Sequence, residues 1–332
     1  MTAPRFGVGF RANRDPADYE RIGRLAEDLG FDVVSVFADL GDEPPLGALL
    51  SVASATKRVS LGPACMNPYT THPVEIAGSI AVLDRAAGGR AYLGLARGAW
   101  LDAIGVAQPR PVRTLNEAAT IVRLLLARDR GGYAGEIFRL SPGFVLERAA
   151  PRSEVPLLIG GWGAATVALA GEIAAELKVG GSANPDMVGV IRQRLAVGAR
   201  RAGRPADATA VVLGAVTVVD EDGSAARRFA RTAVARYFEV VCSLDPTITL
   251  PPGLKEALQT RLARGDVEGA GDMIPDALMD RFSFAGTPKQ VSRQVDEILA
   301  RGASRIEFGA PFGLDGVGGL RIIGERVLPL FR

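Results

Sequence analysis

The chain has 332 residues, of which 48% are hydrophobic and 23% are charged. These are ordinary values for a soluble globular protein, so extensive disorder is not expected, and the length suits one large domain or two ordinary ones. Lys and Arg number 39 against 37 Asp and Glu, and this near-neutral balance argues against a nucleic acid or an anionic membrane surface as partner.

Cysteine and histidine are scarce, which limits the possible chemistry. The two cysteines, Cys65 and Cys242, lack CxxC spacing, and His72 is the single histidine. We therefore expect no metal site and no Cys–His nucleophile, and His72 itself is expected to be structural. The N-terminus has no apolar signal segment, and no run of about 18 apolar residues occurs, which predicts a soluble, cytoplasmic protein.

The first third of the chain alternates predicted strands and helices. The run at 32–37 (DVVSVF) is almost continuously apolar, which is typical of a strand buried on both faces. Pro73 suits a first helical position, and Gly88 and Gly89 favour a helix end near Ala87. Together these signals predict strands at 5–11, 32–37, 59–66 and 90–96, and helices at 15–29, 45–56 and 73–87.

One stretch, 59–98, forms a strand, loop, helix and strand in succession, the crossover that parallel strands need. Its loop, Asn67-Pro-Tyr-Thr-Thr71, is polar and stiff. It could present groups to a ligand or serve as a connector.

The remaining chain continues the alternation with two interruptions. An excursion hairpin is predicted at about 131–148, and a proline-rich insertion or lid with little periodicity at about 243–284. Strands are predicted at 155–159, 177–179, 210–219 and 305–308, and helices at 112–127, 164–170, 185–202, 224–241, 287–300 and 320–330.

Eight strand–helix units in one chain predict an α/β fold, a (β/α)₈ barrel with insertions, formed by a single domain over 1–332. A doubly wound sheet is the competing architecture, but no GxGxxG follows the first strand. In a barrel, functional groups gather where strands end. The rim predicted here is Gly-rich, aromatic and weakly charged, which suits a large planar cofactor: Asp39, 64–69, 97–100, 160–163, 180–182 and 310–312.

Several ordered segments resemble one family. They read NPYTTHP (67–73), AVLDRAAGGRAYLGLARG (81–98), VPLLIGGWGAATVALAGEIA (155–174), FAGTPKQVSRQVDEILARGASRIEFGAPFG (284–313) and IIGERVLP (322–329). The set is similar to the bacterial luciferase-like oxidoreductase superfamily, and most to the branch that uses the deazaflavin coenzyme F420, in particular the methylenetetrahydromethanopterin reductases.

The resemblance implies hydride transfer between coenzyme F420 and an electron-poor C=C or C=N bond. It implies a cis peptide bond between Ala64 and Cys65 that supports the ring, and a phosphate-bearing tail on backbone N–H groups at a helix N-terminus. The implied cofactor-binding residues are Asp39, Ala64, Cys65, Asn67, Arg97, Gly98, Gly160, Gly161, Trp162, Gly163, Ala164, Gly180 and Gly181.

Asp39 matches the family's acidic residue after the second strand, and Asp39, Tyr69 or a water is the expected proton donor. The family commonly follows this Asp with a His, whereas here Leu40 follows, and no acidic group lies in Arg97-Gly-Ala-Trp100. These departures argue against a sugar phosphate or a methanopterin as substrate and favour a tailoring reductase of secondary metabolism.

Simpler roles stay open for five residues. Asp39 could be an N-cap or a loop carboxylate, Cys65 a packed strand residue, and Arg97 part of a rim salt bridge. Trp100 and Trp162 could belong to the core.

Two functional alternatives also stay open: an FMN-dependent monooxygenase of the same superfamily, and a barrel that binds cofactor without catalysis. In each case we expect a small-molecule or peptide substrate and a homodimer.

Overall fold

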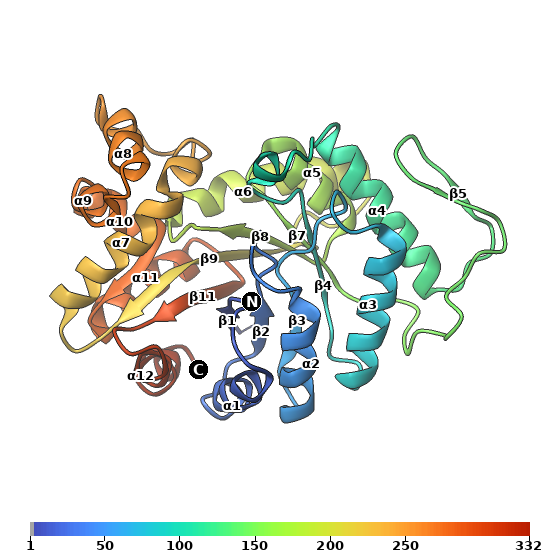
Figure 1. Ribbon diagram of the computed structural model, residues 1–332, viewed down its shortest axis with the longest axis horizontal. Helices are drawn as coiled ribbons and strands as arrows, with labels where there is room; N and C mark the ends of the chain where they lie inside the picture. The colour runs from blue at the N-terminus through green and yellow to red at the C-terminus, as the bar shows by residue number, and fades with distance from the viewer. Residues whose placement is uncertain (1–2) are drawn as a thin grey trace.

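The computed structural model describes residues 3–332, and its parallel strands close into a barrel (Figure 1). The strand order is β3-β2-β1-β11-β9-β8-β7-β4. Bridges between Leu61 and Ala91 and between Met66 and Leu95 join the two ends of this series. The barrel is therefore confirmed, because a doubly wound sheet would keep two open edges. The wall strands are β1 (Arg5–Phe10), β2 (Val33–Val36), β3 (Ser60–Pro63), β4 (Leu93–Ala96), β7 (Leu157–Gly160), β8 (Glu176–Gly180), β9 (Ala210–Val219) and β11 (Arg305–Phe312).

Helices cover the outside of the barrel (Figure 1), and six of them begin at a proline, as predicted. Proline is suited to this position because its missing N–H would have no partner in the helix. His72 precedes α3 and is exposed, and its Nδ1 accepts a hydrogen bond from the Val74 N–H at 3.2 Å, so it caps this helix. These helices are α1 (Pro16–Asp28), α2 (Pro45–Ala55), α3 (Pro73–Ala86), α4 (Pro111–Leu126), α6 (Pro185–Arg201) and α11 (Pro288–Ala300).

Close contact between β3 and β4 explains two glycines. A Cβ on Gly62 would lie 2.2 Å from the Tyr92 carbonyl oxygen, and one on Gly94 would lie 2.1 Å from the Pro63 carbonyl oxygen. Any side chain at either position would push the strands apart at the closure of the barrel.

The segment between α7 (Gly223–Cys242) and α11 differs from the prediction. It was predicted to lack periodicity over 243–284, but it contains α8 (Leu254–Ala263), α9 (Val267–Asp272) and α10 (Asp276–Phe282). It ends in a ninth strand, β10 (Ser283–Gly286), which pairs with the end of β9. These helices are too short to show an amphipathic period, and four residues give little strand signal.

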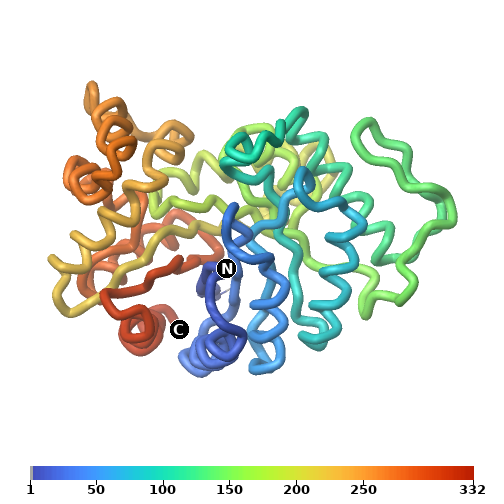
Figure 2. Tube along the Cα trace, in the orientation of Figure 1, coloured from blue at the N-terminus to red at the C-terminus, as the bar shows by residue number. Residues whose placement is uncertain are grey.

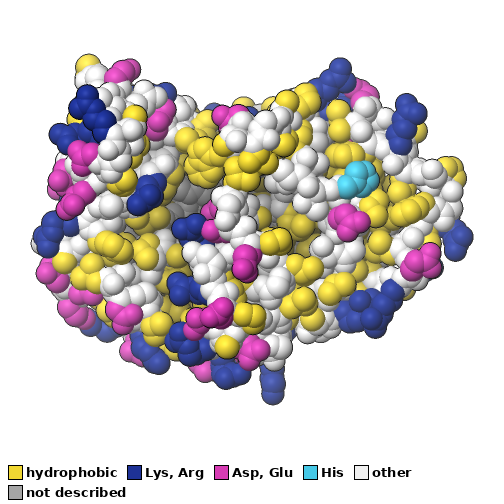
Figure 3. Space-filling view, in the orientation of Figure 1, with side chains coloured by type: hydrophobic (Ala, Val, Ile, Leu, Met, Phe, Trp, Pro, Cys, Tyr) yellow, Lys and Arg dark blue, Asp and Glu magenta, His cyan; other side chains and the backbone are white. Residues whose placement is uncertain are grey.

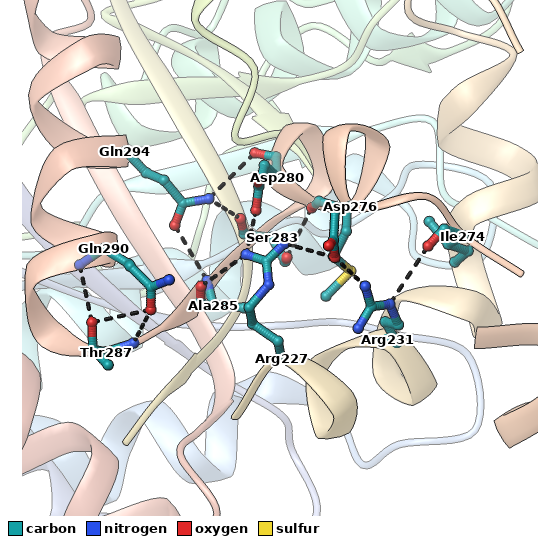
Figure 4. A network of polar contacts seen from close by, with 11 residues as sticks. Arg227, Arg231, Ile274, Asp276, Asp280, Ser283, Ala285, Thr287, Gln290 and Gln294 are labelled. Carbon is teal, nitrogen blue, oxygen red and sulfur yellow. Dashed lines mark hydrogen bonds and ion pairs between the residues drawn. The ribbon is translucent and has the colours of Figure 1, made fainter. Parts of the chain in front are cut away.

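Charged side chains anchor this segment to α7 (Figure 4). Arg227 donates to Asp280 at 2.6 Å and to Asp276 at 3.0 Å, and Arg231 also bonds Asp276. Gln294 of α11 donates to the carbonyl oxygens of Asp280 and Ser283. The predicted insertion is thus fixed at its C-terminal end to the barrel helices on both sides.

Smaller differences occur at element ends. The hairpin strands β5 (Tyr133–Ala134) and β6 (Arg139–Leu140) pair within the predicted excursion, which projects from the barrel on the side away from α8 and α9 (Figure 2). The helix after Gly163, α5 (Ala164–Ile173), extends beyond the predicted 170. The closing helix starts earlier, as α12 (Gly316–Ile322), and changes pitch over Ile323–Val327 and Leu328–Phe331. No helix within residues 3–332 has the length and apolar character needed to cross a membrane.

Candidate active site

The carboxyl ends of the barrel strands form one mouth, where the predicted site residues lie. Parallel strands in one barrel end at the same side, so the loops after them surround a common space. Figure 3 shows a hollow between the α7–α8 segment and the middle of the molecule, with hydrophobic side chains gathered along its border. Within residues 3–332 no group of three or more His, Cys, Asp or Glu side chains is placed to hold a metal ion.

The peptide bond between Ala64 and Cys65 is cis, as the family resemblance implied. It follows β3 directly, and the neighbouring backbone is held by the Ala64 N–H to the Val36 carbonyl at 2.8 Å and by the Met66 N–H to the Gly94 carbonyl at 2.9 Å. The bulge is therefore attached to strands on both sides and forms a fixed part of the mouth.

The Cys65 side chain turns into the barrel, where it packs against Val33, Tyr92 and Leu158. Burial raises the pKa of its thiol to about 12, so the sulfur stays protonated near neutral pH. This agrees with the simpler reading of Cys65 as a packed strand residue and gives the thiol no nucleophilic role.

Asp39 lies in the loop after β2 and is accessible to solvent. Protein atoms still surround it, and this burial, together with the nearby Asp42 carboxylate, raises the pKa of Asp39, while Arg11 and Lys178 oppose the shift. Asp39 is therefore an exposed carboxyl group whose surroundings disfavour its charged form. The N-cap alternative is wrong, because Pro44 precedes α2 at the cap position.

The loop 67–71 is held by its own side chains. Asn67 Oδ1 accepts hydrogen bonds from the N–H groups of Tyr69 at 3.1 Å and Thr70 at 2.9 Å. The Tyr69 hydroxyl donates to the Pro109 carbonyl at 2.7 Å. Asn67 therefore shapes the loop, and the Tyr69 proton is already engaged, which leaves Asp39 as the better placed of the two proposed proton donors.

The loop after β4 exposes two large side chains. Arg97 makes no ion pair within the described chain, so the structure does not show the alternative of a rim salt bridge. Trp100 is 48% exposed and has a φ of 56°, so its reading as a core residue is wrong. Gly98 has a φ of 84°, and a Cβ there would approach Asn67 at 3.2 Å. This glycine allows the loop to turn closely over the 67–71 segment.

In the turn between β7 and α5, one backbone N–H group is bonded within the protein and others are available to a ligand. The Gly161 N–H donates to the Lys178 carbonyl at 3.0 Å, so it is not free for a ligand. Gly163 caps α5, and the first backbone bond into the helix runs from the Val167 N–H to Gly163. The N–H groups of the first turn, beginning at Ala164, are thus the available anion donors.

Trp162 is 9% exposed, and its Nε1 donates to the Gly180 carbonyl at 3.0 Å, so the core reading holds for this tryptophan. A Cβ on Gly163 or Gly180 would meet no atom of the described residues within 4 Å. Gly181 differs, because its φ is 77° and a Cβ would lie 2.9 Å from Val241. The turn therefore leaves an open cradle beside Gly163 and Gly180.

Sequence reasoning missed a group of buried ions inside the barrel. Glu307 of β11 bonds Lys178 of β8, accepts from Ser35 Oγ at 2.6 Å, and accepts from Arg305 Nη1 at 3.1 Å. The Ser35 hydroxyl also bonds the Tyr92 hydroxyl at 2.7 Å. The available signal was the alternation of charges with apolar residues in ELKVG (176–180) and RIEFG (305–309), which marks strands with a polar inner face.

Comparison with known proteins places this arrangement in context. A family model described as luciferase-like monooxygenase matches residues 1–305. A 5,10-methylenetetrahydromethanopterin reductase from Archaeoglobus fulgidus is 29% identical over 335 residues, which covers 98% of this chain and 99% of that protein. An F420-dependent glucose-6-phosphate dehydrogenase from Amycolatopsis mediterranei is 28% identical over 49% of this chain and 54% of its own. The solved structure of the coenzyme F420-dependent tetrahydromethanopterin reductase from Methanopyrus kandleri has a TM-score of 0.87 at 25% identity and covers 100% of both chains.

Proposed function

Because this chain belongs to the luciferase-like monooxygenase family, we propose that it is a coenzyme F420-dependent oxidoreductase. Its reaction is hydride transfer between the deazaflavin and an electron-poor C=C or C=N bond. The observation that carries this proposal is the likeness over whole chains to reductases named for methylenetetrahydromethanopterin and for coenzyme F420. We also propose that 1–332 works as one catalytic barrel.

The residues of the mouth fit this coenzyme. The cis bond between Ala64 and Cys65 offers a fixed bulge against which a planar ring could rest. Gly163 and Gly180 leave the space that side chains would otherwise fill, and the first turn of α5 offers N–H groups to a phosphate. The exposed Arg97 adds a positive charge at the rim that suits an anionic tail or substrate.

When bound, the deazaflavin supplies or accepts the hydride, and the protein positions the reactants and handles the proton. Asp39 is the group we assign to the proton. Its raised pKa means that it holds a proton at a higher pH than an ordinary carboxyl group does, and it stays accessible in the mouth. Leu40 occupies the position where a second proton-transfer group is common in the family.

An Asp39→Asn variant is expected to bind coenzyme F420 as the wild type does and to reduce its acceptor about 10²–10⁴-fold more slowly, the usual contribution of general acid–base catalysis. The wild-type rate should fall as pH rises through the raised pKa of Asp39, because the proton donor is lost, and this limb should be absent in the variant. Stopped-flow absorbance of the deazaflavin measures both the rate and its pH dependence. The acceptor is an electron-poor alkene or imine that the wild type reduces. Equal rates and equal pH profiles would remove Asp39 from the reaction.

The second candidate is an FMN-dependent monooxygenase, favoured by the description of the matching family model. It predicts oxygen consumption in the presence of reduced FMN.

For the reductase, the departures at Leu40 and at Arg97–Trp100 support a tailoring enzyme that acts on a small molecule or peptide and not on a sugar phosphate. A homodimer and a cytoplasmic location stay predictions, and light scattering tests the first.

A further inference from the structure

A chain of paired charges runs from an exposed arginine up the inside of the barrel and ends beneath the mouth. It starts at Arg5, whose Nη1 lies 3.4 Å from Glu176 Oε1. Glu176 Oε2 lies 2.8 Å from Arg305 Nη2, Arg305 Nη1 lies 3.1 Å from Glu307 Oε2, and Glu307 Oε1 pairs with Lys178. Lys178 is therefore the last ion of the chain, and its side chain is 8% exposed.

The charges in this chain do not cancel. Its three most buried members are two cations, Lys178 and Arg305, and one carboxylate, Glu307, whereas Glu176 and Arg5 at the other end are 17% and 44% exposed and are better screened by water. Glu307 divides its interaction between two cations, and burial of all three groups in the barrel reduces screening by water. The positive potential is therefore strongest at Lys178, which has a single ion-pair partner and lies nearest the mouth.

Lys178 lies among the groups that flank the cis bulge. Its Nζ is 4.9 Å from the centre of the Phe37 ring, at the end of β2. The influence of its charge extends to both Asp39 and Cys65, since Lys178 acts to lower the pKa of each. Lys178 also pairs in register with Gly160, and a Cβ on Gly160 would lie 2.9 Å from Cys65 Sγ, so the lysine lies beside the bulge on which we place the deazaflavin ring.

The other titratable groups near Lys178 neutralise its charge only in part. Burial raises the pKa of Cys65 and that of Tyr92, so both are uncharged near neutral pH. Asp39 titrates at a raised pKa, and Glu307 is already shared with Arg305. The remaining positive charge of Lys178 would therefore attract a negative charge on a bound ring.

We propose that Lys178 stabilises the anionic form of the deazaflavin bound at the Ala64–Cys65 bulge. The oxidised deazaflavin carries a ring hydroxyl group, and loss of its proton gives an anion delocalised over the ring. A nearby cation favours that anion by Coulomb attraction. Bound coenzyme should therefore lose this proton at a lower pH than free coenzyme. The inference depends on the proposed function, because it requires F420 to occupy this mouth.

The test is a pH titration of the visible absorption band of oxidised F420, free and bound to the intact protein. For the wild type we expect the acid dissociation constant of the bound ring to be at least about tenfold larger than that of free coenzyme. Lys178→Met should lose this tenfold difference, whereas Lys178→Arg, which keeps the charge, should retain most of it.

A double variant, Lys178→Met with Glu307→Gln, removes both members of the ion pair and leaves no new unpaired charge between them, which guards against loss of the fold. It should titrate as Lys178→Met does. Bound coenzyme that titrates identically in the wild type and in both methionine variants overturns the inference while leaving the proposed function intact. Failure of F420 to bind the wild type would instead overturn the proposed function, and this inference with it.

Discussion

A Glu307→Gln variant is expected to lose about 3–5 kcal/mol of unfolding free energy, the usual result when one partner of a buried ion pair is removed. Glu307 is 1% exposed and is the shared partner of Lys178 and Arg305. Glutamine keeps the shape but carries no charge, so Lys178 would stay buried without a counterion and Arg305 would keep only Glu176. Urea denaturation at pH 7 measures the loss.

The matched control is Asp18→Asn, which removes the carboxylate of an exposed pair with Arg21. Exposed pairs contribute about 0–1 kcal/mol, so this variant should unfold nearly as the wild type does. A Glu307→Gln variant no less stable than Asp18→Asn would contradict the account of the barrel interior.

The pH dependence of the unfolding free energy tests the ion pairs of Glu307 in a second way. Burial alone would raise the pKa of Glu307, but the cations Lys178 and Arg305 outweigh it, and the pKa lies below the usual range. The stabilisation is therefore complete above the pKa of a glutamate in the unfolded chain. It is lost as pH falls through the lowered pKa of the folded state, and the variant should lack this acid dependence.

A Gly180→Val variant is expected to fold normally and to bind coenzyme F420 about 100-fold more weakly, a change of about 2.7 kcal/mol in binding free energy. Gly180 alternates along β8 with Glu176 and Lys178, so its missing side chain points toward the inside of the barrel at the mouth. Because a Cβ there meets no described atom within 4 Å, valine should not disturb the protein itself. It would occupy the cradle instead.

Gly189→Ala is the control for this variant. Gly189 lies within α6, and a Cβ there also meets no described atom within 4 Å, but this exposed position is on a helix outside the barrel and not at a strand end. Alanine should leave coenzyme binding unchanged and stabilise the helix by up to about 1 kcal/mol. Calorimetric titration compares the two, and wild-type affinity in Gly180→Val would show that the cradle does not hold the coenzyme.

The order of strands and helices could be predicted from sequence because each signal is local. Apolar runs mark the strands, and prolines mark the starts of six helices. The short helices of 254–282 and the strand at Ser283–Gly286 escaped prediction for the same reason, since four to ten residues give too little pattern. The cis bond at Ala64–Cys65 came from family resemblance and not from any local signal.

The candidate site was predicted as a set of positions, but not as a set of contacts. Trp100 and Trp162 are equally aromatic in sequence, yet one is exposed and the other is bonded to Gly180. Lys178 and Glu307 are 129 residues apart, and they meet because β8 and β11 both pair with β9. Pairings of this kind depend on the register of distant strands, which a single sequence does not specify.

The most direct test of the proposed function is a titration of the coenzyme-free protein with F420 and, separately, with FMN, followed by fluorescence or calorimetry. We predict tight, saturable binding of F420 and weak or no binding of FMN. Preference for FMN would point to oxygen chemistry instead, and binding of neither would contradict the assignment of the mouth as a coenzyme site.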